Sequence, residues 1–368
     1  MLDSTDVFVI GGGPAGLAAA IAARQQGFRV LVADGAQPPI DKTCGEALMP
    51  DSLPALQELG ISFRSQECHP FQGVRFLAAG LTAAASFPSR CGLCVRRTTL
   101  HRLMSERAAA LGIDLLWGTP VTGITRSRVC LGSQSVGAKW IIGADGANSR
   151  VRRWANLNTC TRKNFRYAFR RHYRIAPWSD HMELHWSPRG QAYVAQVTDQ
   201  DAIVGLMSRD PQFRADEALR GFPELDARLR AAEISSAERG ALSVTRKLKH
   251  VYSENVILVG DASGTVDPIT GEGLGLSFRQ ALVLAKCLKS GNLAHYQARH
   301  RLLSFRPLLM AGLMLTLDGR AFLQRRTLQI FRKRPEVFRT LLALHVGNVS
   351  PLHLAWDGLT FGWELLTA

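Results

Sequence analysis

The chain has 368 residues, of which 46% are hydrophobic and 20% are charged, and this balance excludes an intrinsically disordered protein. Lys and Arg outnumber Asp and Glu by 45 to 30, which gives a formal net charge of +15. This excess suggests an anionic ligand, a nucleic acid or a membrane surface as a partner, without choosing among them. The longest uncharged apolar run in the C-terminal third, residues 308–317, is about half as long as a membrane span.

Neither the start of the chain nor its cysteine content indicates export. The first residues predict a strand that carries Asp3 and Asp6 rather than a signal peptide. The seven cysteines do not form a disulfide framework in a chain this long, so we expect reduced thiols and a cytoplasmic protein. Cys91 and Cys94 form one C-x-x-C pair, but no second pair exists, and we therefore expect no metal site.

The predicted elements begin with a βαβ unit of about 30 residues. It consists of a buried strand at residues 5–10, a glycine-rich turn at 11–16, an alanine-rich helix at 15–26 and a second buried strand at 29–33. A helix over residues 98–112 ends at a glycine. Short strands are expected after it, over residues 113–117, 120–124, 128–132 and 140–144.

The middle of the chain has a different pattern. Polar and apolar residues alternate over 165–208, which predicts an antiparallel sheet, and residues 214–237 look helical. A strand at 255–259, a helix at 273–289 and a basic helical remainder follow. We expect an α/β fold with an α+β insertion, made of a Rossmann-like domain, an antiparallel-sheet substrate domain and a helical C-terminal region. The Rossmann-like domain is expected over residues 1–160 and 240–290. The antiparallel-sheet domain is expected over residues 161–239, with part of 60–96 as a candidate addition, and the helical C-terminal region over residues 291–368.

Residues 11–16 form a G-x-G-x-x-G pattern between the first strand and the first helix. The first glycine permits a tight turn, the second lets the backbone approach a pyrophosphate, and the third lets the helix pack on the strand. The unpaired N–H groups of the helix start then face the phosphates. Asp34 lies 23 residues after the first glycine, where a carboxylate can accept hydrogen bonds from ribose hydroxyls.

Two later motifs indicate which dinucleotide is bound. Residues 143–152 (GADGANSRVR) follow one strand, and residues 260–264 (GDASG) follow another, before Gly271 and Gly273 open a helix. A carboxylate at a strand end can hold further ribose or ribityl hydroxyls, and a helix N-terminus can face the N1–C2=O edge of a flavin. A nicotinamide dehydrogenase does not need these two additional motifs.

The three motifs, in this order over residues 5–290, resemble the FAD-dependent family with the para-hydroxybenzoate hydroxylase fold. That family includes aromatic hydroxylases, flavin halogenases and geranylgeranyl reductases. The resemblance implies FAD as the cofactor and NAD(P)H as a transient reductant. The cofactor-binding residues that it implies are Gly11, Gly13, Pro14, Ala15, Gly16, Asp34, Arg97, Val121, Asp145, Gly146, Gly260, Asp261, Gly271, Gly273 and Leu274.

Residues 41–50 (DKTCGEALMP) resemble a segment of geranylgeranyl reductases and of bacterial polyketide-tailoring flavin oxidoreductases. In that branch the cysteine lies close to the flavin ring, so Cys44 is a candidate for lining the site, with a small buried thiol as the alternative. Residues 264–268 depart from the pattern of common aromatic hydroxylases, which disfavours simple benzoate-type substrates. A halogenase would carry a Trp-x-Trp-x-Ile-Pro segment, and the sequence has none.

In this family the antiparallel sheet covers the substrate pocket over the flavin. Residues 183–194 lie on that sheet, and their alternation would turn some aromatic and polar side chains inward. His185 could act as a base towards a phenol, although the pattern favours a histidine with a structural role. The candidate catalytic residues are Cys44, His185 and Tyr193.

The resemblance favours a monooxygenase that hydroxylates a hydrophobic phenolic or polyketide-derived substrate through a flavin C4a-hydroperoxide, with NAD(P)H and O2. The alternatives are reduction of C=C bonds in a prenyl or lipid substrate, halogenation, and a flavoprotein that holds FAD only as a structural group. Residues 299–339 carry ten basic and two acidic side chains interleaved with apolar ones. They predict either a solvated helix face or peripheral contact with a membrane, and without a recognised module we expect no nucleic-acid partner.

Overall fold

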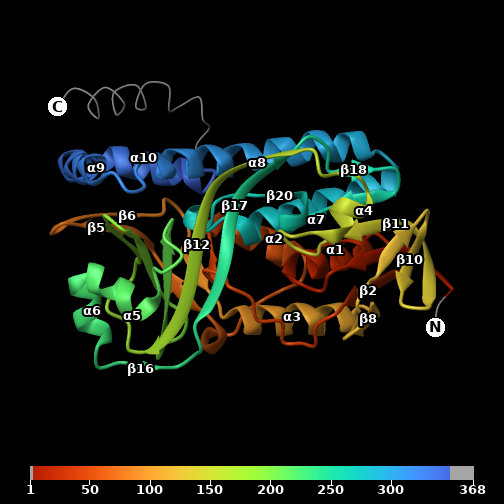
Figure 1. Ribbon diagram of the computed structural model, residues 1–368, viewed down its shortest axis with the longest axis horizontal. Helices are drawn as coiled ribbons and strands as arrows, with labels where there is room; N and C mark the ends of the chain where they lie inside the picture. The colour runs from red at the N-terminus through yellow and green to blue at the C-terminus, as the bar shows by residue number, and fades with distance from the viewer. Residues whose placement is uncertain (1–2, 349–368) are drawn as a thin grey trace.

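The computed structural model describes residues 3–348 and shows two large sheets side by side, with helices packed around them (Figure 1). The first sheet has the strand order β18-β19-β11-β1-β2-β8, and its strands from β19 to β8 pair in parallel. The bounds are β1 Ser4–Ile10, β2 Val30–Asp34, β8 Asp114–Trp117, β11 Gln134–Gly143, β18 Tyr252–Ser253 and β19 Val256–Leu258. Strands β9 (Gly123–Thr125) and β10 (Arg128–Leu131) form an antiparallel extension of β11.

The first sheet is the centre of the main hydrophobic core. Val7, Phe8 and Val9 of β1 are all fully buried, as expected for a parallel strand that is covered on both faces. Helix α1 (Pro14–Gln25) contacts both α3 (Arg97–Ala110) and α7 (Gly273–Ser290), and its run of alanines lets these neighbours approach closely.

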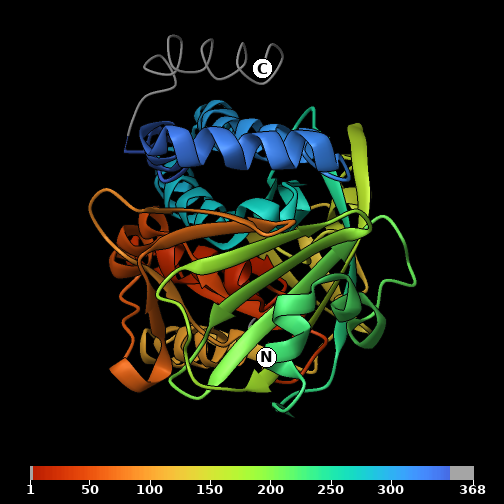
Figure 2. The same ribbon diagram turned by 90° about the vertical axis from the view of Figure 1, so that its left-hand side faces the viewer.

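The second sheet is mostly antiparallel, with the order β20-β17-β12-β15-β14-β13-β5-β6. Its bounds are β5 Gly73–Ala78, β6 Leu81–Ser86, β12 Cys160–Arg174, β13 Met182–Ser187, β14 Gly190–Gln196, β15 Asp201–Ser208, β16 Glu233–Ile234, β17 Arg239–Leu248 and β20 Gly264–Thr265. Short helices α5 (Ala215–Ala218) and α6 (Pro223–Leu229) lie against one face of this sheet, as Figure 2 shows in green. A third, small sheet joins β3 (Ala47–Leu48), β7 (Gly92–Cys94) and β4 (His69–Phe71).

The opposite face of the second sheet is covered by helices from the end of the described chain. These are α9 (Ala321–Lys333) and α10 (Pro335–His345), whereas α8 (Leu293–Thr316) packs mainly on α7; all three lie along the top of Figure 1. Phe76 of β5 stacks on Trp186 of β13 with ring centroids 4.7 Å apart, and Phe338 of α10 lies 5.4 Å from the same Phe76 ring. This aromatic group joins the sheet to the C-terminal helices.

The remaining helical elements are short. They are α2 (Leu53–Glu58) and α4 (Arg150–Trp154), with the 3-10 turns η1 (Pro50–Ser52), η2 (Ser65–Glu67), η3 (Leu219–Gly221), η4 (Gly260–Ser263) and η5 (Pro268–Thr270). Within residues 3–348 no single helix is long and apolar enough to cross a membrane, and α8 and α9 meet that test only as a pair bent by 113°.

The predicted α/β class with an antiparallel insertion and C-terminal helices is confirmed. Two details differ. Residues 239–248 form β17 and pair with β12 in the second sheet, from Arg239 opposite Arg170 to Leu248 opposite Cys160. From residue 240 onward they had been expected to belong to the nucleotide-binding domain. The helix expected over 214–237 is broken before Pro223, because proline has no N–H to continue a helix, and residues 233–234 form β16. The part of the C-terminal region beyond residue 348 lies outside the described residues.

Candidate cofactor and substrate site

Backbone contacts bring the three glycine motifs together at the start of α1. A Cβ atom added to Gly11, whose φ is +109°, would lie 2.5 Å from the carbonyl oxygen of Ala144 in the second motif. A Cβ atom on Gly260 of the third motif would lie 2.6 Å from the Cβ of Ala15. A Cβ atom on Gly16 would overlap the carbonyl oxygen of Gly11, so α1 can begin this close to β1 only without a side chain there.

The first turn of α1 is free to bind an anion. Gly13 is the N-cap residue and supplies no side-chain cap, and Pro14 at the first helical position needs no partner for a backbone N–H. The carboxylate of Asp34, at the end of β2, accepts hydrogen bonds from Gly12 N at 2.7 Å and from Ala36 N at 2.8 Å. The predicted Val121 is buried in the core after β8.

Arg97, the first residue of α3, lies across the same turn. Its Nη2 is 3.7 Å from the position that a Cβ atom on Gly13 would occupy. Its Nε is buried and has no hydrogen-bond partner among the residues that the structure describes. A guanidinium placed there can pair with a phosphate or with the edge of a bound ring.

Asp261 lines a small hollow that is open to solvent, together with Gly260, Gly264 and Gly273. Solvent reaches this carboxylate from the hollow, whereas protein surrounds its other sides, and this burial raises its pKa above the usual range for an aspartate. The positive charges of Arg97, Lys42 and Arg246 act in the opposite direction. The cofactor arginine and residues 41–50 therefore lie near the aspartate of the third motif.

The second motif contributes another carboxylate. Asp145 Oδ2 accepts hydrogen bonds from Arg150 N at 2.6 Å and Val151 N at 3.1 Å, and so caps α4. Its Oδ1 is buried, and no described residue donates to it. Gly146, with φ of +81°, has open space where a side chain would project.

The third motif continues into a loop that opens α7. Gly271 has φ of +64°, and a Cβ atom there would come within 2.7 Å of the Met49 side chain, in the segment that carries Cys44. Gly273 has nothing within 4 Å of its Cβ position, so a planar ring can approach the backbone at the start of α7. Leu274 follows and packs partly against the main core.

Cys44 and Tyr193 are brought together. The Tyr193 hydroxyl donates to the carbonyl oxygen of Gly45 at 2.5 Å and lies 4.0 Å from the sulfur of Cys94. The sulfur of Cys44 accepts from Glu46 N at 3.4 Å. Burial raises the pKa of the Tyr193 hydroxyl well above its ordinary value, so this group remains protonated.

His185 does not join this group. In β13, Leu184 pairs with Tyr193 and His185 with Ala192, so successive side chains of the strand point to opposite faces. His185 Nε2 lies 3.1 Å from Glu183 Oε2, and its ring meets the ring of Phe222 at the α6 side, with centroids 6.3 Å apart. The structure thus places the histidine on the face of the sheet away from Tyr193, and this corrects the expectation of an inward-facing base.

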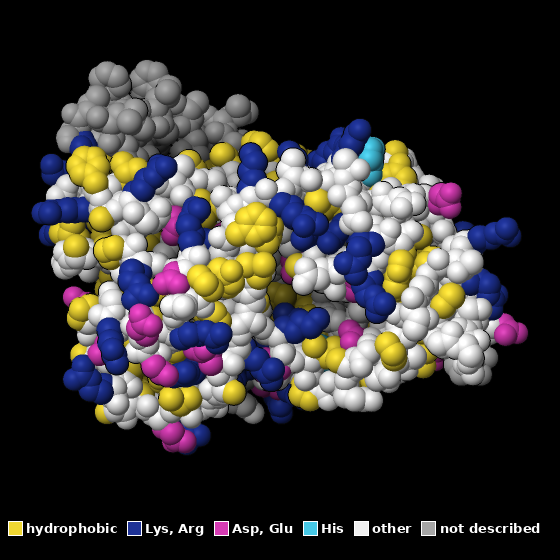
Figure 3. All heavy atoms as spheres, viewed as in Figure 1, with side chains coloured by type: hydrophobic (Ala, Val, Ile, Leu, Met, Phe, Trp, Pro, Cys, Tyr) yellow, Lys and Arg dark blue, Asp and Glu magenta, His cyan; other side chains and the backbone are white. Residues whose placement is uncertain are grey.

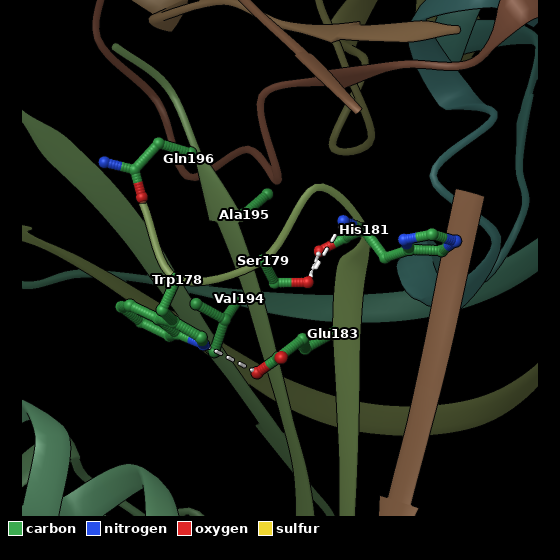
Figure 4. A pocket seen from close by; sticks show the side chains of 7 residues that line it. All are labelled: Trp178, Ser179, His181, Glu183, Val194, Ala195 and Gln196. Atoms are coloured by element: carbon green, nitrogen blue, oxygen red, sulfur yellow. Dashed lines mark hydrogen bonds between the residues drawn. The ribbon is translucent and has the colours of Figure 1, made fainter. Parts of the chain in front are cut away.

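A small hollow at the end of the second sheet is also separate from the motifs. Figure 4 shows its seven lining side chains, with Trp178 Nε1 donating to Glu183 Oε2 at 3.1 Å. Cys44, Tyr193 and Asp261 are not among these residues.

Two polar residues that the sequence analysis did not single out lie behind the site and contact residues that line it. Glu46, in the segment 41–50, is buried and has φ of +59°. Its carboxylate lies 2.8 Å from His172 Nε2 on β12 and accepts from Arg97 N at 2.9 Å. The sequence contains no signal for this pair, because its members are separated by more than a hundred residues and one has an unusual backbone conformation.

These features fit FAD. Glycines are required at the turn, α1 and α7 present free N-termini, and Asp145 and Asp261 offer acceptor oxygens that protein donors leave open. The arrangement defines a dinucleotide-dependent oxidoreductase of the flavin type. The family model described as FAD binding domain matches residues 4–303, and the chain belongs to this family and binds FAD.

Two curated relatives are similar over most of their length. The menaquinone reductase of Mycolicibacterium smegmatis is 30% identical over 322 residues, covering 80% of this chain and 78% of the relative. The digeranylgeranylglycerophospholipid reductase 1 of Methanothermobacter thermautotrophicus is 31% identical over 297 residues, covering 74% of each chain.

Two solved structures share the fold. A flavoprotein/dehydrogenase from Cytophaga hutchinsonii has a TM-score of 0.82 at 18% identity, covering 97% of this chain and 96% of that chain. PqsL from Pseudomonas aeruginosa, described as "a probable FAD-dependent monooxygenase", has a TM-score of 0.75 at 21% identity, covering 86% of this chain and 97% of that chain.

Proposed function

We propose that this FAD-dependent oxidoreductase reduces a carbon–carbon double bond in a hydrophobic, lipid-like substrate. The observation that carries the proposal is the similarity, over about three quarters or more of the chain, to two relatives whose names both describe reduction of a lipid. When bound, the flavin supplies the two-electron chemistry that links a reductant such as NAD(P)H to the substrate.

The side chains around the site suit an apolar substrate. Ala47 and Met49, which follow Cys44 along the chain, belong to the same buried cluster as Phe76 and Trp186 of the second sheet. Apolar walls exclude water from the reacting atoms. Reduction of a double bond also requires a proton, and in our proposal the Cys44 thiol and the protonated Tyr193 hydroxyl are the candidate donors.

The position of His185 reduces the support for hydroxylation of a phenol. That reaction was favoured by the sequence partly because His185 could serve as a base on the inward face. The histidine instead bonds to Glu183 on the other face of the sheet.

Hydroxylation remains the second candidate because of the stacked pair Phe76 and Trp186, whose planes are inclined by 23°. The buried cluster that contains this pair also includes Ala47 and Met49 of the Cys44 segment, and aromatic side chains next to a site suit a flat aromatic ring. In this case O2 would be the second substrate, and the product would carry an oxygen atom derived from it.

Product analysis separates the two reactions. The purified protein would be incubated with NAD(P)H and either menaquinone or a geranylgeranyl lipid, with and without O2. Reduction of a carbon–carbon double bond predicts a product whose prenyl chain gains two hydrogen atoms under both conditions; two hydrogen atoms gained at the quinone ring alone would not support the proposal. A product that gains oxygen, and that forms only when O2 is present, would replace our proposal by hydroxylation.

We also propose contact with an anionic membrane surface. Among the described residues, Leu302, Phe305 and Leu313 are exposed on one side of α8 at helical spacing, and Phe322 is exposed on α9. Figure 3 shows hydrophobic side chains among Lys and Arg along the upper edge of the molecule, over these helices. Exposed apolar side chains with cations beside them are suited to contact with anionic lipids, because the apolar groups leave water and the cations meet the headgroups.

Flotation with anionic liposomes tests this contact. Leu302→Ser should reduce the bound fraction, whereas Leu242→Ser, at a residue on β17 that is 53% exposed against 60% for Leu302, should not. Equal binding of both variants and the parent protein would contradict the assignment of the surface to α8.

A further inference from the structure

We propose that Glu46 is a positioning residue, which holds the Cys44 segment and Arg97 in fixed relation to the substrate sheet through a buried hydrogen bond to His172. The inference goes beyond the proposed function, since it does not depend on which substrate is reduced or hydroxylated. Glu46 is only 3% exposed, and its two carboxylate oxygens have different partners: Arg97 N at 2.9 Å and His172 Nε2 at 2.8 Å.

The hydrogen bonds around His172 determine where its ring carries a proton. Arg170 Nη1 lies 3.1 Å from His172 Nδ1, and a guanidinium can only donate. Ser236 Oγ accepts from His172 N at 3.1 Å, and it lies closer to His172 Nδ1, at 2.8 Å, than to the other acceptor for its proton, the Ala237 carbonyl oxygen at 3.4 Å. Nδ1 is consequently the acceptor, and Nε2 carries the proton that is donated to Glu46.

Two donors thus converge on Glu46, which explains why a carboxylate is needed. A carboxylate offers an acceptor oxygen to both Arg97 N and His172 Nε2. A glutamine offers one oxygen and would turn its NH2 group towards the other donor. Because the site is buried, that donor would lose its partner without gaining water.

The bonds of Glu46 extend to both sides of the site. On the cofactor side, Arg97 begins α3, and its guanidinium lies beside Gly13 and within the electrostatic reach of Asp261. On the substrate side, Glu46 N donates to the sulfur of Cys44. The neighbouring carbonyl oxygen, that of Gly45, accepts from Tyr193. A shift of Glu46 would therefore move Arg97 and the Cys44 segment together.

The test uses Glu46→Gln and measures FAD binding to the apoprotein by fluorescence, together with the midpoint potential of the bound flavin. We expect the Kd for FAD to rise about ten-fold or more, because the variant no longer holds Arg97 in place, and loss of one charge-assisted hydrogen bond to the cofactor costs roughly that factor. We also expect the potential to shift, since Arg97 is the charge that Glu46 positions. Thermal unfolding of each apoprotein reports any general loss of stability.

Glu67→Gln is the matched control. Glu67 is also a buried glutamate, and it pairs with Arg102 of the same helix α3 and with Arg64, away from the glycine motifs. This variant should unfold more easily while its Kd for FAD and its flavin potential remain unchanged. An equal change of Kd and potential in both variants would mean that the effect is general destabilisation of α3, and would overturn the proposal.

A second substitution distinguishes positioning from a simple packing role. His172→Gln alone retains an N–H donor towards Glu46 and should bind FAD nearly as the parent protein does. When His172→Gln is combined with Glu46→Gln, the side chain introduced on β12 can turn its carbonyl oxygen towards the new amide, so the double variant should recover most of the FAD affinity. An additive loss in the double variant, or an unchanged Kd and potential in Glu46→Gln itself, would refute the role of the pair.

Discussion

The backbone of Gly11 lies directly against the backbone of Ala144, and a Cβ atom on Gly11 would come within 2.5 Å of the Ala144 carbonyl oxygen. The first residue of the dinucleotide motif is thereby joined to the motif that carries Asp145, more than a hundred residues later. This contact explains how two strand ends that are distant in sequence form one cofactor cavity.

Gly11→Ala is expected to abolish FAD binding, because the added methyl group must displace the Ala144 peptide. The free energy of unfolding should fall by about 1 to 3 kcal/mol, as is usual for overpacking. Gly27→Ala is the control: its φ is also positive, at +93°, but nothing lies within 4 Å of its Cβ position. Flavin content after gel filtration separates them, and equal FAD retention in both variants would contradict the role of the contact.

Asp261→Ala should purify without FAD, because the cavity loses its carboxylate acceptor next to Arg97. The side chain is exposed to solvent in the cavity, so its truncation should leave the variant apoprotein about as stable as the parent. The flavin released on denaturation gives the occupancy. A normal flavin-to-protein ratio would show that Asp261 does not hold the cofactor.

Cys44→Ala and Tyr193→Phe should both retain FAD, since neither side chain is part of the glycine motifs. We expect altered turnover in each, with a change in KM or kcat, because the Tyr193 hydroxyl fixes the Gly45 peptide beside Cys44. Steady-state kinetics with the natural reductant provide the measurement. Unchanged kinetics in both variants would show that the two side chains only pack and have no role in turnover.

His300 on α8 should make the apoprotein less stable in mild acid. Its Nε2 lies 2.8 Å from Ser263 Oγ, and burial lowers its pKa to about 4. An unfolded histidine titrates near its ordinary value, so the folded state binds fewer protons as the pH falls from about 6.5 to about 4. The protein therefore loses about 3 kcal/mol of folding stability over this pH range. The full contribution of neutral His300 to stability is present above the ordinary pKa of histidine.

Urea unfolding at neutral pH and at about pH 5 checks this expectation. The parent protein should lose more stability on acidification than His300→Gln, which keeps a donor for Ser263 but cannot take up the proton. The same pH dependence in both proteins would show that other groups determine the acid sensitivity.

The glycine motifs could be read from the sequence because their chemistry is local. Gly11 and Gly16 stand where a Cβ atom would collide with backbone, and the strand before them is a short apolar run. Asp34 and Asp261 follow directly from their spacing to these glycines.

The substrate side could not be derived in the same way. The register of β13 determines whether His185 or Tyr193 faces inward, and a shift of one residue exchanges the two faces. Glu46 and His172 meet only after β12 is placed beside the segment 41–50, and no periodicity encodes that contact.

Anaerobic optical titration of the reduced enzyme tests the central claim most directly. The flavin would be reduced with NAD(P)H or dithionite without O2, and menaquinone or a geranylgeranyl lipid would then be added. Our account predicts that the absorbance of oxidised flavin returns in proportion to the substrate added, with one double bond reduced per flavin. Flavin that stays reduced until O2 enters, and then forms an oxygenated product, would contradict it.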